Sequence, residues 1–275
     1  LPTQIGLDSD DALAEGEVFD PSPSNIESRA VRSTLPVGMK VALLEKQTRG
    51  NVVVGRVTLR FGDERSLSGR VDAARMVGAM LDKGTKTRTR QQIKEEFDRI
   101  KAQVFFSSSG NAITAQFQTT RENLMPALAL VAEVLRDPIF PAAEFEEMKT
   151  QQLAGLESQK SEPTSLAVTL YGQKMSPYPA SSPQATKSID ESIAIAKAMT
   201  VADVKSVYAD MVGATYGDVA VVGDFDRAAV SQWATATFNT WKSPRPFARF
   251  KRIYFDVPQF NERSETPDKA NAFFL

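Results

Sequence analysis

Three short segments carry side chains that could take part in catalysis or bind a ligand. Ser107–Ser109 offers hydroxyl groups that could act as nucleophiles. Glu95, Glu96 and Asp98 form an acidic cluster of the kind that can bind a hard cation. Val219–Asp226 resembles the apolar strand ending in aspartate that many nucleoside triphosphatases contain. Each segment needs further groups for such chemistry: a base beside the serines, more metal ligands beside the acidic cluster, and a phosphate-binding loop beside the strand. Whether the chain contains these groups decides between a functional and a structural interpretation.

The partners that these segments need are missing, because the chain of 275 residues contains no histidine and no cysteine. No imidazole can activate a serine, and no Gly-x-Ser-x-Gly turn surrounds Ser107–Ser109. Catalytic zinc sites nearly always include histidine, so an all-oxygen metal site is the alternative that stays open. No phosphate-binding loop accompanies Val219–Asp226. We therefore expect structural roles for all three segments. Ser107–Ser109 should form a hairpin turn, and the acidic cluster should lie on a solvated helix face in which Glu95 pairs with Arg99. Val219–Asp226 should be a strand followed by a helix cap.

The charge of the chain is balanced, with 33 basic and 34 acidic residues and a net charge of −1. This balance argues against a nucleic-acid partner or a membrane-surface protein, both of which need a basic face. The basic stretch Lys83–Arg90 is the alternative, although a solvated loop explains it equally simply. No apolar run approaches the roughly 20 residues that span a bilayer, so we expect a globular domain without a membrane span.

The elements that would position these side chains follow an α+β order. In Val52–Phe61, apolar and polar residues alternate, which predicts a strand with one buried face. Further strands are expected at Lys40–Glu45, Gln103–Ser108, Ala112–Thr119 and Asp218–Gly223, and helices at Thr89–Ala102, Asn123–Leu135, Ala142–Gln159, Thr164–Lys174, Val201–Asp210 and Arg227–Phe238, with another helix capped by Ser66 or Ser68. This order predicts a mixed or antiparallel sheet with helices packed on one face.

The two ends of the chain differ in composition from its middle. Residues 1–35 are acidic and contain several prolines, which is typical of a linker or leader. Residues 36–245 hold the predicted strands and helices and form the expected domain. Residues 246–275 start as a proline- and arginine-rich connector, and the final Ala-Asn-Ala-Phe-Phe-Leu predicts the first strand of a truncated following domain.

The stretch Met80–Val104 resembles the pitrilysin/insulinase family of zinc metallopeptidases and the related mitochondrial processing peptidases. In that family a helix ends in a Lys-Gly-Thr turn and is followed by a second helix and a hairpin. Other segments look like the family pattern in the same order: Thr120–Leu124, Leu135–Pro141, Phe145–Gln151, Ser161–Pro163, Ala198–Val204 and Val221–Asp226. The resemblance covers roughly residues 32–245.

Active members of the family carry His-x-x-Glu-His just before the Lys-Gly-Thr turn. The two histidines share a helix face and bind zinc, the glutamate activates a bound water, and a later glutamate completes the ligands. In this sequence the motif positions fall on Arg75, Gly78 and Ala79, and the later glutamate falls near Gly155. The resemblance therefore implies a degenerate motif with no catalytic residue and no metal ligand, and it leaves the substrate-binding residues unknown.

The resemblance implies a processing-peptidase-like domain, one of several similar domains that pair as two halves around a peptide-holding chamber. We predict a non-catalytic domain of a bacterial zinc metalloendopeptidase that supports proteolysis by a zinc-bearing half, in the same chain or a separate subunit. Two alternatives stay open: a scaffold or binding protein of the same fold without a peptidase role, and an enzyme with a carboxylate-only metal site. A periplasmic location is an expectation from similar bacterial proteins, since the sequence carries no signal for it.

Overall fold

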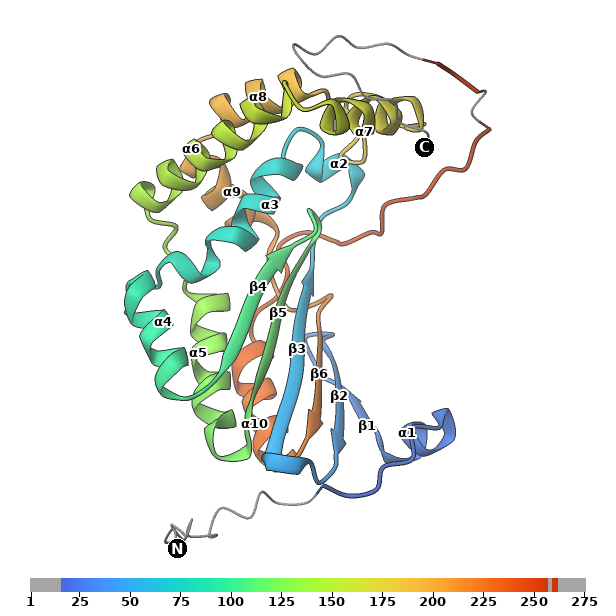
Figure 1. Ribbon diagram of the computed structural model, residues 1–275. Helices are drawn as coiled ribbons and strands as arrows, with labels where there is room; N and C mark the ends of the chain where they lie inside the picture. Colours follow the sequence, from blue (N-terminus) through green and yellow to red (C-terminus); the bar gives the residue numbers. More distant parts are fainter. Residues whose placement is uncertain (1–15, 257–258, 262–275) are drawn as a thin grey trace, which may run out of the picture.

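A six-stranded sheet forms the centre of the structure, a computed structural model that describes residues 16–256 and 259–261 (Figure 1). The strand order is β1–β2–β6–β3–β5–β4. The strands are β1 Val31–Thr34, β2 Lys40–Glu45, β3 Val52–Arg60, β4 Gln103–Ser108, β5 Ala112–Thr120 and β6 Asp218–Gly223. β2 and β6 run parallel, and the other neighbours run antiparallel. The sheet is therefore mixed, as predicted, with β1 and β4 at its edges.

Helices cover one face of the sheet and extend beyond one end of it. The described helices are α1 Pro23–Arg29, α2 Glu64–Leu67, α3 Val71–Met80, α4 Arg90–Arg99, α5 Leu124–Arg136, α6 Ala142–Gln159, α7 Pro163–Lys174, α8 Ile189–Ala198, α9 Val201–Met211 and α10 Arg227–Phe238. Helix α1 lies apart from this layer, beside the edge strand β1 (Figure 1). Figure 1 shows α5 and α10 against the sheet, and α6, α7 and α8 as an arc beyond its end. Among the described helices, none combines the length and the apolar character that crossing a membrane requires.

Alternation along the central strands places the core on the helix-covered side of the sheet. Val53, Val57 and Leu59 of β3 are each 0% exposed. The ring of Phe117 lies over Gly55 on the neighbouring strand, where a Cβ atom would come within 2.2 Å of the ring. Glycine is therefore required at this position, because the aromatic ring fills the space of a side chain. The predicted buried face is confirmed at Val57 and Leu59, whereas the polar Thr58 between them is also buried, at 6% exposed.

The sheet begins earlier in the chain than the sequence predicts. Residues 16–35 include α1 and β1, and β1 pairs antiparallel with β2, with Val31 opposite Leu43. The interpretation of residues 1–35 as linker is therefore wrong for this part, because a short exposed strand shows no apolar alternation that would reveal it. At the other end, the strand predicted at residues 270–275 lies outside the described residues.

Two helix starts also differ from the prediction. The predicted cap of α3 at Ser66 or Ser68 is wrong, because α3 starts after Arg70 without a side-chain cap. Ser66 and Ser68 belong instead to the short preceding helix α2, whose cap Asp63 accepts a hydrogen bond from the Ser66 amide at 2.7 Å. Helix α8 was not predicted, although Ser188 and Glu191 form a capping box at its start. The cap predicted at the end of Val219–Asp226 is confirmed at Asp226, and Thr89 caps α4, which begins the helix predicted from that residue.

Candidate functional site

The helix α3, which carries the three degenerate motif positions, packs against the edge strand β4 and against α9. Its residues Ala74, Val77 and Met80 are each 0% exposed. The Ser108 hydroxyl at the end of β4 donates a hydrogen bond to the Ala74 carbonyl at 3.0 Å. This bond and the buried apolar face fix the helix directly over the strand end.

Gly78 lies at the closest point of this contact. A Cβ atom at Gly78 would lie 2.4 Å from the Cβ of Ser108 and 2.7 Å from its amide nitrogen. Both distances are far shorter than van der Waals contact, so a side chain at this position requires the helix and the strand to move apart. In this packing the position has no room for a glutamate.

The other degenerate positions lie at the surface. Arg75 is exposed, and its guanidinium donates to the Asp72 carboxylate at 2.8 Å. Ala79 is exposed on α3. Gly155 is exposed on α6, with open space where a Cβ would stand. Zinc does not fit these positions, because a guanidinium has no lone pair for a metal and glycine and alanine have no donor atom.

The basic stretch Lys83–Arg90 is neutralised by carboxylates. Arg88 pairs with Glu133, Lys86 with Asp137 at 2.5 Å, and Arg90 with Glu144 at 3.0 Å. Counterion-driven binding of nucleic acid needs several free cations aligned on one face. These ion pairs leave no such face here, so the turn has a structural explanation.

Glu133 of α5 organises this turn. Its carboxylate accepts hydrogen bonds from the hydroxyls of Thr85 at 2.5 Å and Thr87 at 2.6 Å, and it pairs with Arg88. Thr85 is 3% exposed. Water cannot replace a lost acceptor at a buried hydroxyl. Losing this hydrogen bond therefore destabilises the fold more than losing one at an exposed hydroxyl.

We expect Glu133→Gln to lower the free energy of unfolding by about 1–2 kcal/mol, because an amide accepts these hydrogen bonds more weakly than a carboxylate. Urea denaturation followed by circular dichroism measures the change. Glu95→Gln is the matched control: Glu95 is exposed and accepts from the Gln91 amide at 2.7 Å, so its change stays below about 0.5 kcal/mol. Equal unfolding midpoints for the two variants would contradict this assignment of Glu133.

The remaining candidates have structural roles. Glu96, rather than the predicted Glu95, pairs with Arg99, and the hydrogen bond from that guanidinium lowers the pKa of Glu96. Asp226 accepts hydrogen bonds from two amides at the start of α10. Within residues 16–256 and 259–261, no three acidic side chains come together to hold a metal ion. The carboxylate-only alternative therefore gains no support.

Sequence reasoning missed the exposed edge of the sheet at β4. This strand pairs with β5 on one side and has no strand on its other side among the described residues. Phe105, at its centre, is 67% exposed. An aromatic residue at an outward position of the predicted Gln103–Ser108 strand was the signal that could have indicated a binding edge.

A comparison with protein families matches residues 69–183 to the family described as Insulinase (Peptidase family M16). The matched segment contains α3, the Lys-Gly-Thr turn, the β4–β5 hairpin and α6. A comparison with curated proteins finds no match to the chain.

Solved structures share the fold. A peptidase M16 inactive domain from Pseudomonas fluorescens superimposes with a TM-score of 0.67 and 24% identity, covering 80% of this chain and 53% of that chain. A protease from Helicobacter pylori gives a TM-score of 0.65 and 18% identity over 83% of this chain and 54% of its own. The periplasmic protease PqqL from Escherichia coli gives 0.64 and 14% identity over 82% of this chain and 25% of its own.

The chain therefore spans about half of the first two structures, at 53% and 54%, and a quarter, at 25%, of the third. A shared fold at these identities establishes architecture, while the activity belongs to the residues of the site. The site here carries no histidine, because the chain has none. Residues 69–183 therefore match the insulinase family, peptidase family M16, the chain shares the fold of solved peptidase M16 structures, and it contains no histidine that could form a His-x-x-Glu-His motif.

Proposed function

We propose that this domain is a non-catalytic part of a zinc metalloendopeptidase. It forms part of the wall of the peptide-enclosing chamber and supports cleavage by a zinc-bearing half in the same chain or in a separate subunit. The observation that carries the proposal is the contact of Gly78 with Ser108. The helix that holds the zinc motif in active relatives is kept here as a packing element, with no room for the catalytic glutamate.

The free edge of β4 is the part of this domain that we propose contacts peptide. An edge strand offers unpaired backbone N–H and C=O groups, and an extended peptide can pair with them as an added strand. Phe105 supplies an exposed aromatic side chain beside this edge. The ring gives apolar contact to a peptide side chain, while the backbone bonds are independent of the peptide sequence.

The test mixes this chain with the zinc-bearing half encoded in the same reading frame or beside it. Alone, the chain is expected to bind no zinc and to cleave no peptide. Added to the zinc-bearing half, it is expected to raise kcat/KM for an unfolded peptide at least about tenfold, which corresponds to about 1.4 kcal/mol of transition-state stabilisation. Metal analysis and a fluorogenic peptide assay measure the two quantities.

Two edge-strand variants sharpen this test. Phe105→Ser removes the exposed ring from β4 and is expected to raise KM about two- to fivefold, the range of one cross-strand side-chain contact. Val31→Ser is the matched control on the opposite edge strand β1, where Val31 is 40% exposed, and it should leave KM unchanged. Cleavage by the chain alone would overturn the proposal. Failure to associate with the zinc-bearing half would favour a scaffold protein of the same fold.

A further inference from the structure

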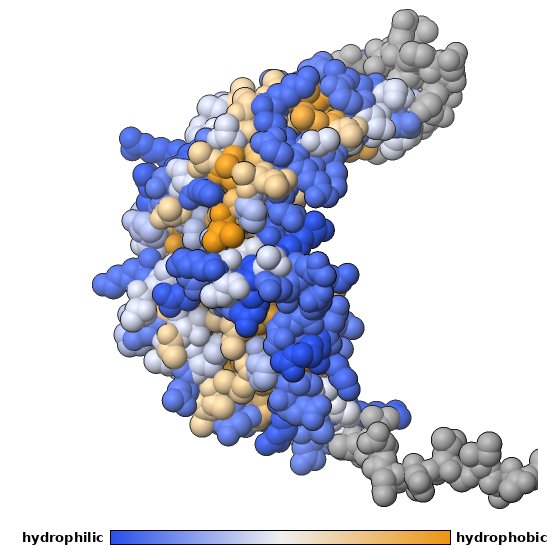
Figure 2. Space-filling view, turned by 90° about the vertical axis from the view of Figure 1, so that its left-hand side faces the viewer, coloured by the Kyte–Doolittle hydropathy of each residue, from blue (hydrophilic) through white to orange (hydrophobic). Residues whose placement is uncertain are grey.

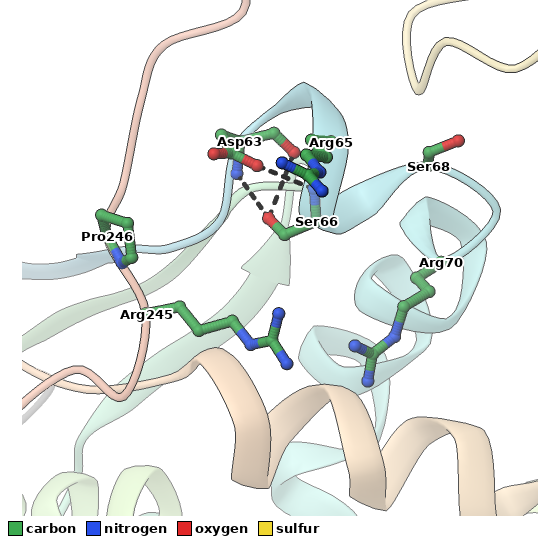
Figure 3. Close-up of a pocket in the computed structure, with 7 residues that line it drawn as sticks. All are labelled: Asp63, Arg65, Ser66, Ser68, Arg70, Arg245 and Pro246. Carbon is green, nitrogen blue, oxygen red and sulfur yellow. Dashed lines mark hydrogen bonds between the residues drawn. The ribbon is translucent and has the colours of Figure 1, made fainter.

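A cavity with a volume of ≈470 Å³ lies beside α2, apart from the β4 edge. Two distant parts of the chain build it: the segment from Asp63 to Arg70, and Arg245 with Pro246 in the connector after α10 (Figure 3). The connector is held there because the Ala248 amide donates to the Gly62 carbonyl at 3.0 Å. The cavity is therefore a product of the folded chain.

Three arginines give this cavity its charge. Arg70 donates to the Ser206 hydroxyl at 2.8 Å and to the Asp210 carboxylate at 2.9 Å. Arg65 and Arg245 interact with carboxylates only at longer range: the charge of Arg65 lowers the pKa of Asp63, and that of Arg245 lowers the pKa of Asp210. Figure 3 shows the Arg245 and Arg70 guanidinium groups pointing toward one another across the cavity. Two like charges that face each other favour an anion between them.

The acidic residue in the lining, Asp63, offsets only part of this positive charge. The carboxylate of Asp63 is occupied at the start of α2, where the Ser66 amide hydrogen bond lowers its pKa. Asp210, outside the lining, pairs with Arg70, and the charge of Arg245 also lowers its pKa. Three guanidinium groups therefore line the cavity against two carboxylates, both of them already engaged. Guanidinium binds carboxylate and phosphate groups through paired, parallel hydrogen bonds.

We infer that this cavity binds a peptide through an acidic side chain or a terminal carboxylate. Its volume falls in the range of sites that enclose a ligand larger than a single oxyanion. Its lining contains no aromatic ring on which a nucleotide base could stack, so a peptide is favoured over a nucleotide. The choice of peptide rests on the proposed chamber role, whereas the anion site rests on the arginines alone.

The experiment measures binding of a fluorescein-labelled peptide of alternating glutamate and glycine to the whole chain, by fluorescence anisotropy at low salt. A peptide with glutamine in place of glutamate, and an amidated C-terminus, is the comparison ligand. We expect the glutamate peptide to bind and the glutamine peptide to bind at least about fivefold more weakly, which matches the upper range of a half-exposed charge pair. Added salt should weaken binding of the glutamate peptide, because it screens the charges.

Arg245→Gln is the test variant and Arg249→Gln is its matched control. Arg249 is exposed on the same connector and lies outside the cavity lining. We expect Arg245→Gln to lower the affinity for the glutamate peptide about fivefold and Arg249→Gln to lower it less than twofold. Because both variants lose one positive charge, only a specific site separates them.

Two results would overturn the inference. Equal weakening by the two variants would show that only the net charge attracts the peptide, and tighter binding of ATP than of the peptide would assign the cavity to nucleotides. The outcome is independent of the cleavage assay. Peptide binding that depends on Arg245, without stimulation of the zinc-bearing half, would sustain the site and reject the proposed function. Stimulation of the zinc-bearing half without peptide binding that depends on Arg245 would support the proposed function and reject the anion site.

Discussion

Gly78→Ala is expected to lower the free energy of unfolding by about 3 kcal/mol, at the upper end of overpacking effects. The added methyl group meets the Cβ of Ser108 at 2.4 Å and its backbone nitrogen at 2.7 Å. Backbone cannot rotate away as a long side chain can, so α3 must lift from β4 and weaken the hydrogen bond from Ser108 to Ala74. Chemical denaturation, with the slope of the transition compared between variants, measures the effect.

Gly155→Ala is the matched control, because it makes the same change in another helix. Gly155 is exposed, and nothing lies within 4 Å of the added methyl group. Alanine favours the helix over glycine by about 0.5–1 kcal/mol, so this variant should be more stable than the natural chain. Opposite signs for the two variants identify close packing as the cause. If Gly78→Ala were also stabilising, α3 would not lie as close to β4 as described.

This result also bears on recovery of the family chemistry. Glutamate at residue 78 places its Cβ atom at the same point as alanine, so it meets the same obstruction whatever its carboxylate contacts. Restoring the zinc ligands therefore requires a new spacing between helix and strand. Exchange of side chains at Arg75, Gly78 and Ala79 does not supply that spacing.

Phe145→Ala is expected to lower the free energy of unfolding by about 3–4 kcal/mol, the range for truncating a buried phenylalanine. Phe145 is the buried residue of α6 and is 0% exposed. The rest of that helix is exposed or half-buried, and α6 in turn contacts α8. The Lys149 ammonium group adds to this contact by donating to the carbonyls of Lys197 and Met199, each at 2.8 Å.

Hydrogen exchange distinguishes a local from a global effect of Phe145→Ala. Because this ring attaches α6 to the core, we expect amides in α6 and α8 to lose protection before those of β3 and β5. Leu156→Ala, on the same helix, is the control: Leu156 is half-buried and should cost less than about 1.5 kcal/mol. A similar loss of stability in both variants would mean that α6 is anchored along its whole length.

Figure 2, which shows the side of the molecule that carries α6 and α8, has apolar patches among charged residues. This mixed surface agrees with the exposure of α6. Phe145, Met148, Leu153 and Leu156 recur at helical spacing in α6, but only Phe145 is buried. Periodicity predicts which side of a helix turns inward, whereas the neighbours that cover that side come from the tertiary structure.

Residue types and short spacings were sufficient to predict most of the elements and to exclude several kinds of chemistry. Local patterns placed β2, β4, β6, α6 and α10 with the observed bounds, because side-chain alternation and caps act between residues a few positions apart. The absence of histidine by itself excludes imidazole-based catalysis within this chain. Conclusions of this kind need no knowledge of which distant residues meet.

The relations between distant residues, in contrast, depend on how the chain folds. The parallel pairing of β2 with β6 joins segments separated by most of the chain, and nothing in either strand encodes its neighbour. By its local sequence, Gly78 is an ordinary helical glycine, and only the contact with Ser108 makes it indispensable. Arg70 and Arg245 likewise belong to one cavity only after folding. Close packing and shared cavities arise from contacts across the fold, so a local pattern cannot specify them.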